Sequence, residues 1–258
     1  MRKTELLKIL NKIAPLELAD DWDNCGMQLD FGKTEIDKVF VAMELSGSVV
    51  EAAKQCGADM IITHHPIFLK SFAPVKLTAA NVNHRNVFEL IRSGIEVYSS
   101  HTCFDIAQGG NNDYLCGMLG IKDVEVIDYG LRVGRPAKPT TLAEFEKQVF
   151  EVLGKPAGFV ASGDPDKKIN KIALCTGGAD DFWETALASG ADVYLTGEME
   201  HHKAILARQT DMAFIAAGHA GTEWIFVPNM AEQLKSLCKG QLEVISSTDH
   251  QVPYDRAY

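Results

Sequence analysis

The six cysteines of this 258-residue chain are scattered and form no Cys-x-x-Cys pair. Zinc ribbons, thioredoxin-like redox motifs and iron–sulfur runs all require closely spaced cysteines, so the sequence supports none of them. Scattered thiols instead favour an intracellular, cytoplasmic protein whose cysteines stay reduced.

The chain also lacks a long apolar run and a surplus of positive charge. No stretch reaches the roughly 20 apolar residues that a membrane-spanning helix needs, so we expect no membrane association. Lys and Arg number 25 against 35 Asp and Glu, a formal net charge of −10. Without a basic stripe to neutralise phosphates, nucleic-acid binding is disfavoured. The first ten residues mix charged and apolar side chains and predict an amphipathic helix, not a signal peptide.

Short apolar segments alternate with helical patterns along the chain. Strands separated by helices of about ten residues indicate β-α-β units, so the predicted fold class is α/β with a three-layer α/β/α architecture. Thr140 or Thr141 is the expected N-cap of the last predicted helix. The predicted elements are a strand at 38–43, a helix at 49–56 ended by Gly57, a strand at 59–63, a helix at 87–93, a strand at 95–99 and a helix at 142–153.

An internal repeat underlies this alternation. A shift of 133 residues places residues 38–65 on residues 171–198 without a gap, and seven of the 28 positions are identical. Average composition alone would give about two matches. Each copy has the order strand, helix, Gly-Ala-Asp, strand, Thr, which predicts two lobes of similar topology from an internal duplication.

Histidines gather at the predicted strand ends, where ligands bind in open α/β sheets. Both halves also continue from a strand into His-x-x-x-acid, ending at Asp105 and at Glu223. These two segments favour a metal site over a simple hydrogen-bonded histidine pair. Adjacent side chains on an extended chain diverge, so two ions roughly 3.5–4 Å apart suit the first histidine pair better than one. The histidines concerned are His64, His65, His101, His201, His202 and His219.

The predicted ligand types narrow the choice of metal and substrate. Mixed imidazole and carboxylate ligands suit zinc, iron, manganese, cobalt or nickel better than magnesium or calcium. Two divalent ions with two carboxylates leave a net positive charge, which a bridging hydroxide or an anionic substrate such as a phosphate ester would balance. His201 and His202 are the candidates for substrate contact. Trp22 is predicted to pack in the core, with Asp23 and Asn24 in a turn.

Six motifs spread over nearly the whole chain resemble those of the NIF-three-like family, also known as GTP cyclohydrolase I type 2 homologues. The resemblance implies a dinuclear metal site with His101 close by, and two α/β lobes that exchange C-terminal segments within a hexameric ring. The ligands that it implies are His64, His65, Asp105, His219 and Glu223. The motifs are Trp22-Asp23-Asn24-x-Gly26, Gly57-Ala-Asp-x-Ile-Ile-Thr-His-His-Pro66, Tyr98-Ser-Ser-His-Thr-x-x-Asp105, Gly109-Gly110-x-Asn112-Asp113, Asp192-Val-Tyr-Leu-Thr-Gly-Glu198-x-x-His-His202 and Gly218-His219-x-x-Thr-Glu223.

Three positions depart from the family pattern. Cys103-Phe104 replaces the usual Asn-Leu, and a thiol beside the site would bias it toward softer metals. Ala220-Gly221 stands where an aromatic residue is common, and Glu44 stands where Asp is more frequent.

Together these features predict a dinuclear metal-dependent hydrolase that acts on a nucleotide-like or phosphorylated small molecule. The resemblance implies GTP ring-opening hydrolysis with release of formate. His101 would shuttle a proton or orient a ligand. We expect residues 1–127 with 219–258 to form the first α/β lobe, carrying most of the metal ligands, and residues 128–218 the second. The alternative is a non-catalytic metal-binding or regulatory protein that forms a hexameric ring.

Overall fold

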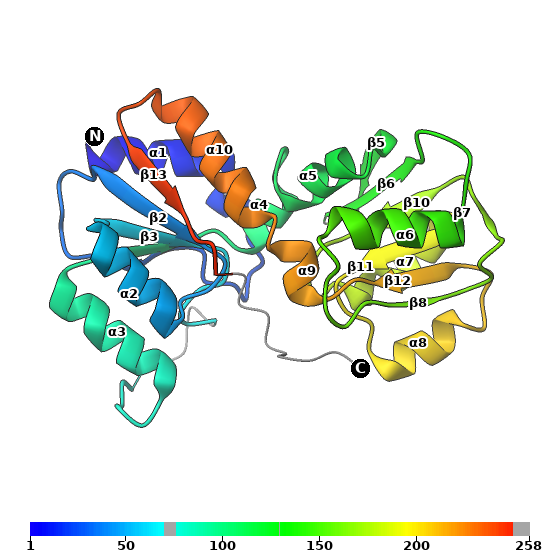
Figure 1. The fold of residues 1–258 in the computed structure, drawn as a ribbon, viewed down its shortest axis with the longest axis horizontal. Coiled ribbons are helices and arrows are strands. Elements are labelled where there is room, and N and C mark those ends of the chain that lie inside the picture. The colour runs from blue at the N-terminus through cyan, green and yellow to red at the C-terminus, as the bar shows by residue number, and fades with distance from the viewer. Residues whose placement is uncertain (70–75, 129, 250–258) are drawn as a thin grey trace. The chain divides into compact units, whose positions relative to one another are not determined.

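The computed structural model describes residues 1–69, 76–128 and 130–249 (Figure 1). The chain divides into two compact units, and each has its own β-sheet and helices. Among the described residues, unit 1 comprises 1–110 and 226–249, and unit 2 comprises 111–225. The predicted α/β class is confirmed.

Unit 1 is built on a five-stranded sheet in the order β1-β4-β3-β2-β13. Its strands are β1 (Gly26–Leu29), β2 (Lys38–Ala42), β3 (Met60–Thr63), β4 (Glu96–Ser99) and β13 (Glu243–Ser246). All pairings in this sheet are parallel except that of the edge strand β1. Its helices are α1 (Lys3–Ile13), the short 3-10 helix η1 (Leu16–Leu18), α2 (Gly47–Cys56), α3 (Val82–Ser93), α4 (Thr102–Ile106) and α10 (Phe226–Cys238).

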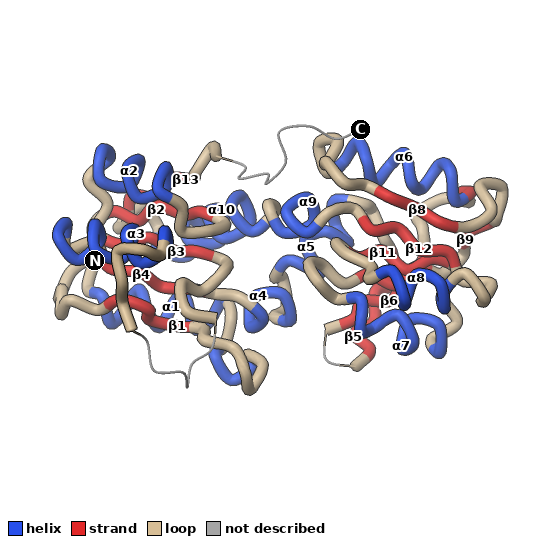
Figure 2. The backbone as a smooth tube through the Cα atoms, turned by 90° about the horizontal axis from the view of Figure 1, so that it is seen from below, coloured by secondary structure: helices blue, strands red, loops and turns tan. Residues whose placement is uncertain are grey.

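Alternate strand residues cover the two faces of this sheet, because side chains point to opposite sides along a strand. Phe40, Ile61 and Val97 pack with α2 and α3. Val39 and Ile62 are fully buried on the opposite face, where α10 lies against β2, β13 and α1. Unit 1 is therefore a helix–sheet–helix sandwich (Figure 2).

Unit 2 has a six-stranded sheet in the order β5-β6-β10-β11-β12-β8 and a small β7-β9 pair. Only β10, β11 and β12 run parallel to one another. The strands are β5 (Lys122–Ile127), β6 (Leu131–Arg135), β7 (Thr140–Thr141), β8 (Val160–Ser162), β9 (Lys168–Ile169), β10 (Ile172–Leu174), β11 (Val193–Thr196) and β12 (Ala213–Ala216). The helices are α5 (Asn111–Met118), α6 (Leu142–Val152), the 3-10 helix η2 (Asp180–Phe182), α7 (Trp183–Ala188), α8 (His201–Ala207) and α9 (His219–Glu223).

The sheet of unit 2 is likewise covered on both faces. Ile172 and Val193 pack with apolar residues of α5 and α6, whereas Ala173 and Tyr194 pack with those of α7 and α8. Each unit thus has three layers. Within the described part of the chain, no helix is both long and apolar enough to cross a membrane.

The elements predicted from the sequence are confirmed to within a few residues at their ends. Gly57 ends α2 in the left-handed conformation, with φ at +69°. Thr141 is the N-cap of α6, where it and Glu144 form a reciprocal capping box.

The boundaries of the two units differ from the predicted lobe boundaries after residues 127 and 218. Residues 111–127 belong to unit 2 because Leu115 of α5 lies in its core and β5 pairs with β6. Residues 219–225 also belong to unit 2, and Ile225 packs in the same core. The exchange of C-terminal segments between lobes stays a prediction.

The two copies of the sequence repeat make the same local contacts. Asp59 Oδ2 accepts the two backbone N–H groups at the start of β2, at 2.9 and 3.2 Å. Asp192, 133 residues later, accepts the two that lead into β10, at 2.7 and 2.9 Å. Each aspartate closes a Gly-Ala-Asp turn whose glycine has a positive φ. The repeated tripeptide therefore ties the start of one parallel strand to the start of the next.

We expect Asp59→Ala to lower the free energy of unfolding of unit 1 by about 1–3 kcal/mol, because two backbone donors and Lys33 lose their acceptor. Burial raises the pKa of Asp59, but the hydrogen bonds from Lys33 and the backbone outweigh it and lower the pKa. A carboxylate with a lowered pKa stabilises the fold above its unfolded pKa, about 4, and loses that effect as pH falls through its folded pKa. Urea unfolding of wild type and variant should therefore differ at neutral pH and converge in strong acid.

Asp21→Ala is the control, because Asp21 is exposed in the same unit. Asp192→Ala should produce a similar loss in unit 2. If Asp59→Ala lowered the free energy of unfolding by the same amount at neutral and at acid pH, the role given to the ionised carboxylate would be contradicted.

Candidate metal centre

The register of two parallel strands brings three histidines of unit 1 to one edge of the sheet. Thr63, the last residue of β3, pairs with Ser99, the last residue of β4, and their hydroxyl oxygens are 2.7 Å apart. His64 and His65 follow β3 directly, and His101 lies two residues beyond β4. Strands that end level with each other therefore place the three imidazoles side by side.

His64 is fully buried and held in one orientation. Its Nδ1 lies 3.0 Å from the Ser100 carbonyl oxygen. Since a carbonyl only accepts, Nδ1 carries the hydrogen and Nε2 carries the lone pair. Nε2 lies 3.5 Å from Asp105 Oδ2, and the Phe226 ring packs 5.0 Å from the imidazole. A lone pair that faces a carboxylate at this distance is stabilised by a proton or a cation between them.

His65 and His101 each direct Nδ1 at a carboxylate. His65 Nδ1 lies 3.4 Å from Glu44 Oε1, and His101 Nδ1 lies 3.0 Å from Asp23 Oδ1. One ligand nitrogen from each of the three histidines lies within 4.8 Å of the others, so the group could hold a metal ion. A metal-binding histidine almost always gives its second ring nitrogen to such an oxygen acceptor. The donor set therefore fits a transition-metal ion.

Asp23 is a buried carboxylate that holds the start of α4. Besides His101, it accepts hydrogen bonds from the backbone N–H and the hydroxyl of Thr102 and from the thiol of Cys25. Burial raises the pKa of Asp23, but the bonds from His101, Thr102 and Cys25 outweigh it and hold the pKa well below its usual range. Asp23 thus stays ionised, and its Oδ1 lies 3.0 Å from His101 Nδ1 as an acceptor.

Several details of unit 1 differ from expectation. The chain bends after Thr63 instead of staying extended, so the rings of His64 and His65 lie 4.9 Å apart and do not diverge. Trp22 is 48% exposed and meets His101 edge-on, so the prediction that it packs in the core is wrong. Cys103 is buried, with its sulfur 3.5 Å from the Ser100 hydroxyl.

In unit 2, His219 lies between two carboxylates. Its Nε2 is 2.9 Å from Glu223 Oε2, one helical turn along α9, and its Nδ1 is 3.2 Å from Glu198 Oε2. Burial lowers the pKa of His219, but the hydrogen bonds and charges of Glu223 and Glu198 outweigh it and raise the pKa to about 9. This part of unit 2 therefore stabilises positive charge, as a cation-binding position must.

Glycines at the ends of β10 and β11 make room for these side chains. A Cβ on Gly177 would lie 2.0 Å from Glu223 Oε1, and one on Gly197 would lie 3.0 Å from His219 Cα. A Cβ on Gly178 would lie 3.4 Å from Glu198 Oε2. The buried Glu223 carboxylate can occupy its place only because Gly177 has no side chain.

The two His-x-x-x-acid segments are not in equivalent positions. His101 is the N-cap of α4, whereas His219 is the first residue of α9, whose N-cap is Gly218. The second segment is thus shifted by one residue along its helix. Glu223 consequently pairs with its own histidine, while Asp105 pairs with His64.

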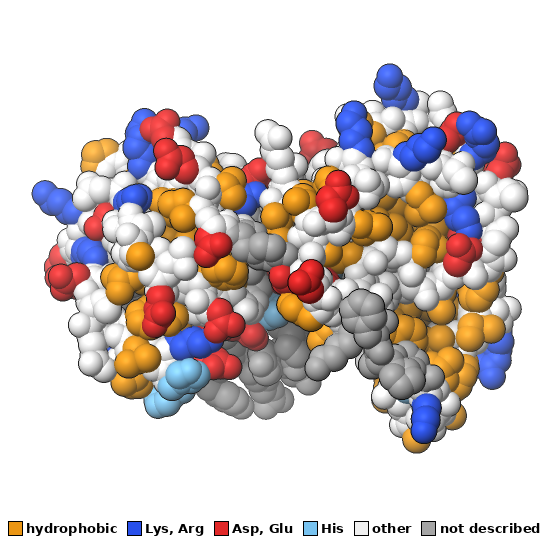
Figure 3. Space-filling model, turned by 180° about the vertical axis from the view of Figure 1, so that it is seen from behind, with side chains coloured by type: hydrophobic (Ala, Val, Ile, Leu, Met, Phe, Trp, Pro, Cys, Tyr) orange, Lys and Arg blue, Asp and Glu red, His pale blue; other side chains and the backbone are white. Residues whose placement is uncertain are grey.

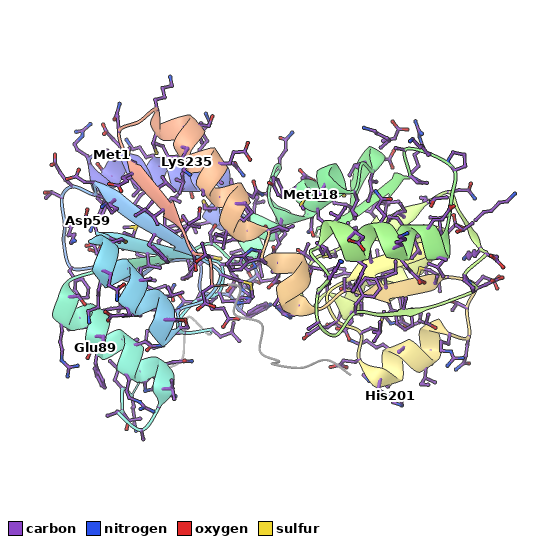
Figure 4. All side chains as sticks on the ribbon, viewed as in Figure 1. Met1, Asp59, Glu89, Met118, His201 and Lys235 are labelled. Atoms are coloured by element: carbon purple, nitrogen blue, oxygen red, sulfur yellow. The ribbon has the colours of Figure 1, made fainter. Side chains whose placement is uncertain are left out.

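His201 and His202, the candidates for substrate contact, begin α8 and are exposed (Figure 4). His202 Nδ1 lies 3.4 Å from Glu200 Oε2. Acidic, lysine and histidine side chains lie together at the surface around α8 (Figure 3). The structure thus gives these histidines a surface position, and their contact with substrate stays a prediction.

Sequence reasoning missed the carboxylates that contact the second nitrogen of each ring. Asp23 was interpreted as a turn residue, and Glu198 was given no role. Both residues stand inside motifs that carry the family resemblance, and this membership was the signal in the sequence that could have identified them. The pairing partner itself could not be identified, because it depends on contacts between segments far apart in the sequence.

We expect Gly177→Ala to displace Glu223 and so to lower the pKa of His219 from about 9 toward its ordinary value in the metal-free protein. Gly190→Ala is the matched control, since Gly190 also has a positive φ, +78° against +71°, but opens onto empty space. Both variants carry backbone strain of about 1–2 kcal/mol. NMR titration of His219 distinguishes the two variants. An unchanged His219 pKa in Gly177→Ala would contradict the claim that a side chain at residue 177 displaces Glu223.

Comparison with known proteins places this site in context. The profile of the Duf34/NIF3 (NGG1p interacting factor 3) family matches residues 1–253. The "GTP cyclohydrolase 1 type 2 homolog" of Clostridium acetobutylicum is 31% identical over 91% of this chain and 90% of its own length. That of Clostridium perfringens is 29% identical over 99% of both. A Bacillus cereus protein related to NIF3 shares the fold, with a TM-score of 0.90 at 19% identity over 100% of this chain and 99% of its own. The chain belongs to the Duf34/NIF3 family.

Proposed function

We propose that the protein is a dinuclear metal-dependent hydrolase. The ligands that we propose are His64, His65, Asp105, His219 and Glu223. One observation carries it: the three histidines of this set, His64, His65 and His219, each direct Nδ1 at an oxygen acceptor, the arrangement that metal-binding histidines have.

The ligand types determine which ions suit the site. Imidazole and carboxylate donors together favour zinc, iron, manganese, cobalt or nickel. When bound, two such divalent ions would lower the pKa of a bridging water and polarise the bond to be hydrolysed. The burial of His64 and Glu223 keeps bulk water away from these side chains.

His101 is the residue that we assign to proton transfer. Asp23 holds its Nδ1–H at 3.0 Å, so Nε2 is the nitrogen that takes up or releases a proton on the side of His64 and His65. Trp22 meets the ring edge-on, with the ring centroids 5.8 Å apart. A fixed imidazole with one exchangeable position is what a general acid–base catalyst needs.

The substrate that we propose is a nucleotide-like or phosphorylated small molecule, bound through its negative charge. The names of the clostridial relatives support GTP as a candidate, with ring-opening hydrolysis as the reaction. His201 and His202 are assigned to substrate contact.

We further propose that the protein is a cytoplasmic homohexamer. Its net charge of −10 disfavours nucleic acid as a partner.

We expect His65→Ala to lose bound metal and, with it, metal-dependent turnover of a panel of nucleotides and phosphoesters. The matched control is His84→Ala, because His84 is a histidine of the same unit that is not among the proposed ligands. Its ring accepts a hydrogen bond from the Thr78 backbone N–H in the loop before α3. Metal content by elemental analysis and product formation are measured on the same samples.

Full metal content and turnover in His65→Ala would contradict the assignment. Bound metal in the wild type without turnover of any compound would instead favour the non-catalytic alternative, a metal-binding or regulatory ring.

A further inference from the structure

Glu198 holds a position that its sequence context does not explain. It is the second residue after β11, as His65 is the second residue after β3, and the two are 133 residues apart in the repeat. In unit 1 that position supplies an imidazole of the candidate metal centre. In unit 2 it supplies a carboxylate that is 60% exposed yet contacts His219 Nδ1 at 3.2 Å.

The surroundings of Glu198 favour this one contact. Gly178 lies beneath the pair, where an added Cβ would meet Glu198 Oε2 at 3.4 Å and His219 Cε1 at 3.6 Å. The opposite ring nitrogen of His219 faces Glu223, which is 3% exposed. The imidazole is therefore held at both ends, by an exposed carboxylate on Nδ1 and by a buried one beside Nε2.

We infer that Glu198 is a positioning residue for His219. Its carboxylate accepts the Nδ1–H, leaves Nε2 as the nitrogen that can bind a metal ion, and fixes the plane of the ring. This inference rests on the proposed function, because it concerns the affinity of the His219 position for metal. Glu198 itself does not bind the metal.

The same arrangement recurs in unit 1, where it is built from different residues. Asp23 and the Ser100 carbonyl take the Nδ1 hydrogens of His101 and His64. Those two acceptors are buried, so their replacement would also disturb the fold. Glu198 is exposed, and it can be replaced with little cost in stability.

The experiment compares three variants by competition with a chelator for zinc, in the full-length protein. Removing such a hydrogen-bond partner costs about 10–100-fold in metal affinity, so we expect Glu198→Ala to weaken one of the two bound equivalents by that factor. Glu198→Gln should restore most of the affinity, because its amide oxygen still accepts the Nδ1–H. Glu200→Ala is the control, since Glu200 is equally exposed, at 61%, but lies beside His202.

A second readout does not need the metal. In the metal-free protein, 15N chemical shifts of the His219 ring report the hydrogen bond at Nδ1. Glu198→Ala should change the Nδ1 shift more than Glu198→Gln does, and Glu200→Ala should leave it unchanged. Unchanged zinc affinity in Glu198→Ala would overturn the inference, as would equal weakening in Glu198→Ala and Glu198→Gln, which would make Glu198 a charged ligand. A wild-type protein that binds no zinc would instead overturn the proposed function.

Discussion

The register of the parallel strands is the constraint on which the candidate site depends. In unit 1, the pairing of β3 with β4 sets the ends of both strands level, so that residues 64 and 101 emerge next to each other. A slip of one residue would turn every strand side chain to the opposite face. At the other end of β3, the hydrogen bonds of Asp59 tie this strand to the start of its other neighbour, β2. Fold and site are therefore specified by the same backbone pairing.

The two halves of the repeat share a framework but differ in what they present. After the threonine that both copies share, Thr63 or Thr196, unit 1 continues with two histidines and unit 2 with Gly197 and Glu198. Glu44 in the first half corresponds to Gly177 in the second, where the missing side chain admits Glu223. The same position of the repeat therefore supplies an imidazole in unit 1 and a carboxylate in unit 2.

Much of the fold could be predicted from the sequence, because it depends on local signals. Apolar periodicity located the strands, Gly57 and Thr141 marked helix ends, and the 133-residue shift revealed the repeat. The lobe boundaries were harder to predict. Whether residues 111–127 and 219–225 belong to the first or the second unit depends on which core Leu115 and Ile225 enter. The one-residue shift between the two His-x-x-x-acid segments was equally hidden, because it depends on where each helix begins. The acceptors behind each histidine are contacts between distant segments, which a single sequence does not reveal.

The central proposal is that five imidazole and carboxylate side chains of this chain hold a pair of metal ions. X-ray diffraction from metal-loaded crystals, recorded on both sides of the metal absorption edge, tests this most directly. The account predicts two anomalous peaks roughly 3.5–4 Å apart, bound by His64, His65, Asp105, His219 and Glu223. A single peak held by the histidines of unit 1 alone, or no peak near any of these residues, would contradict it.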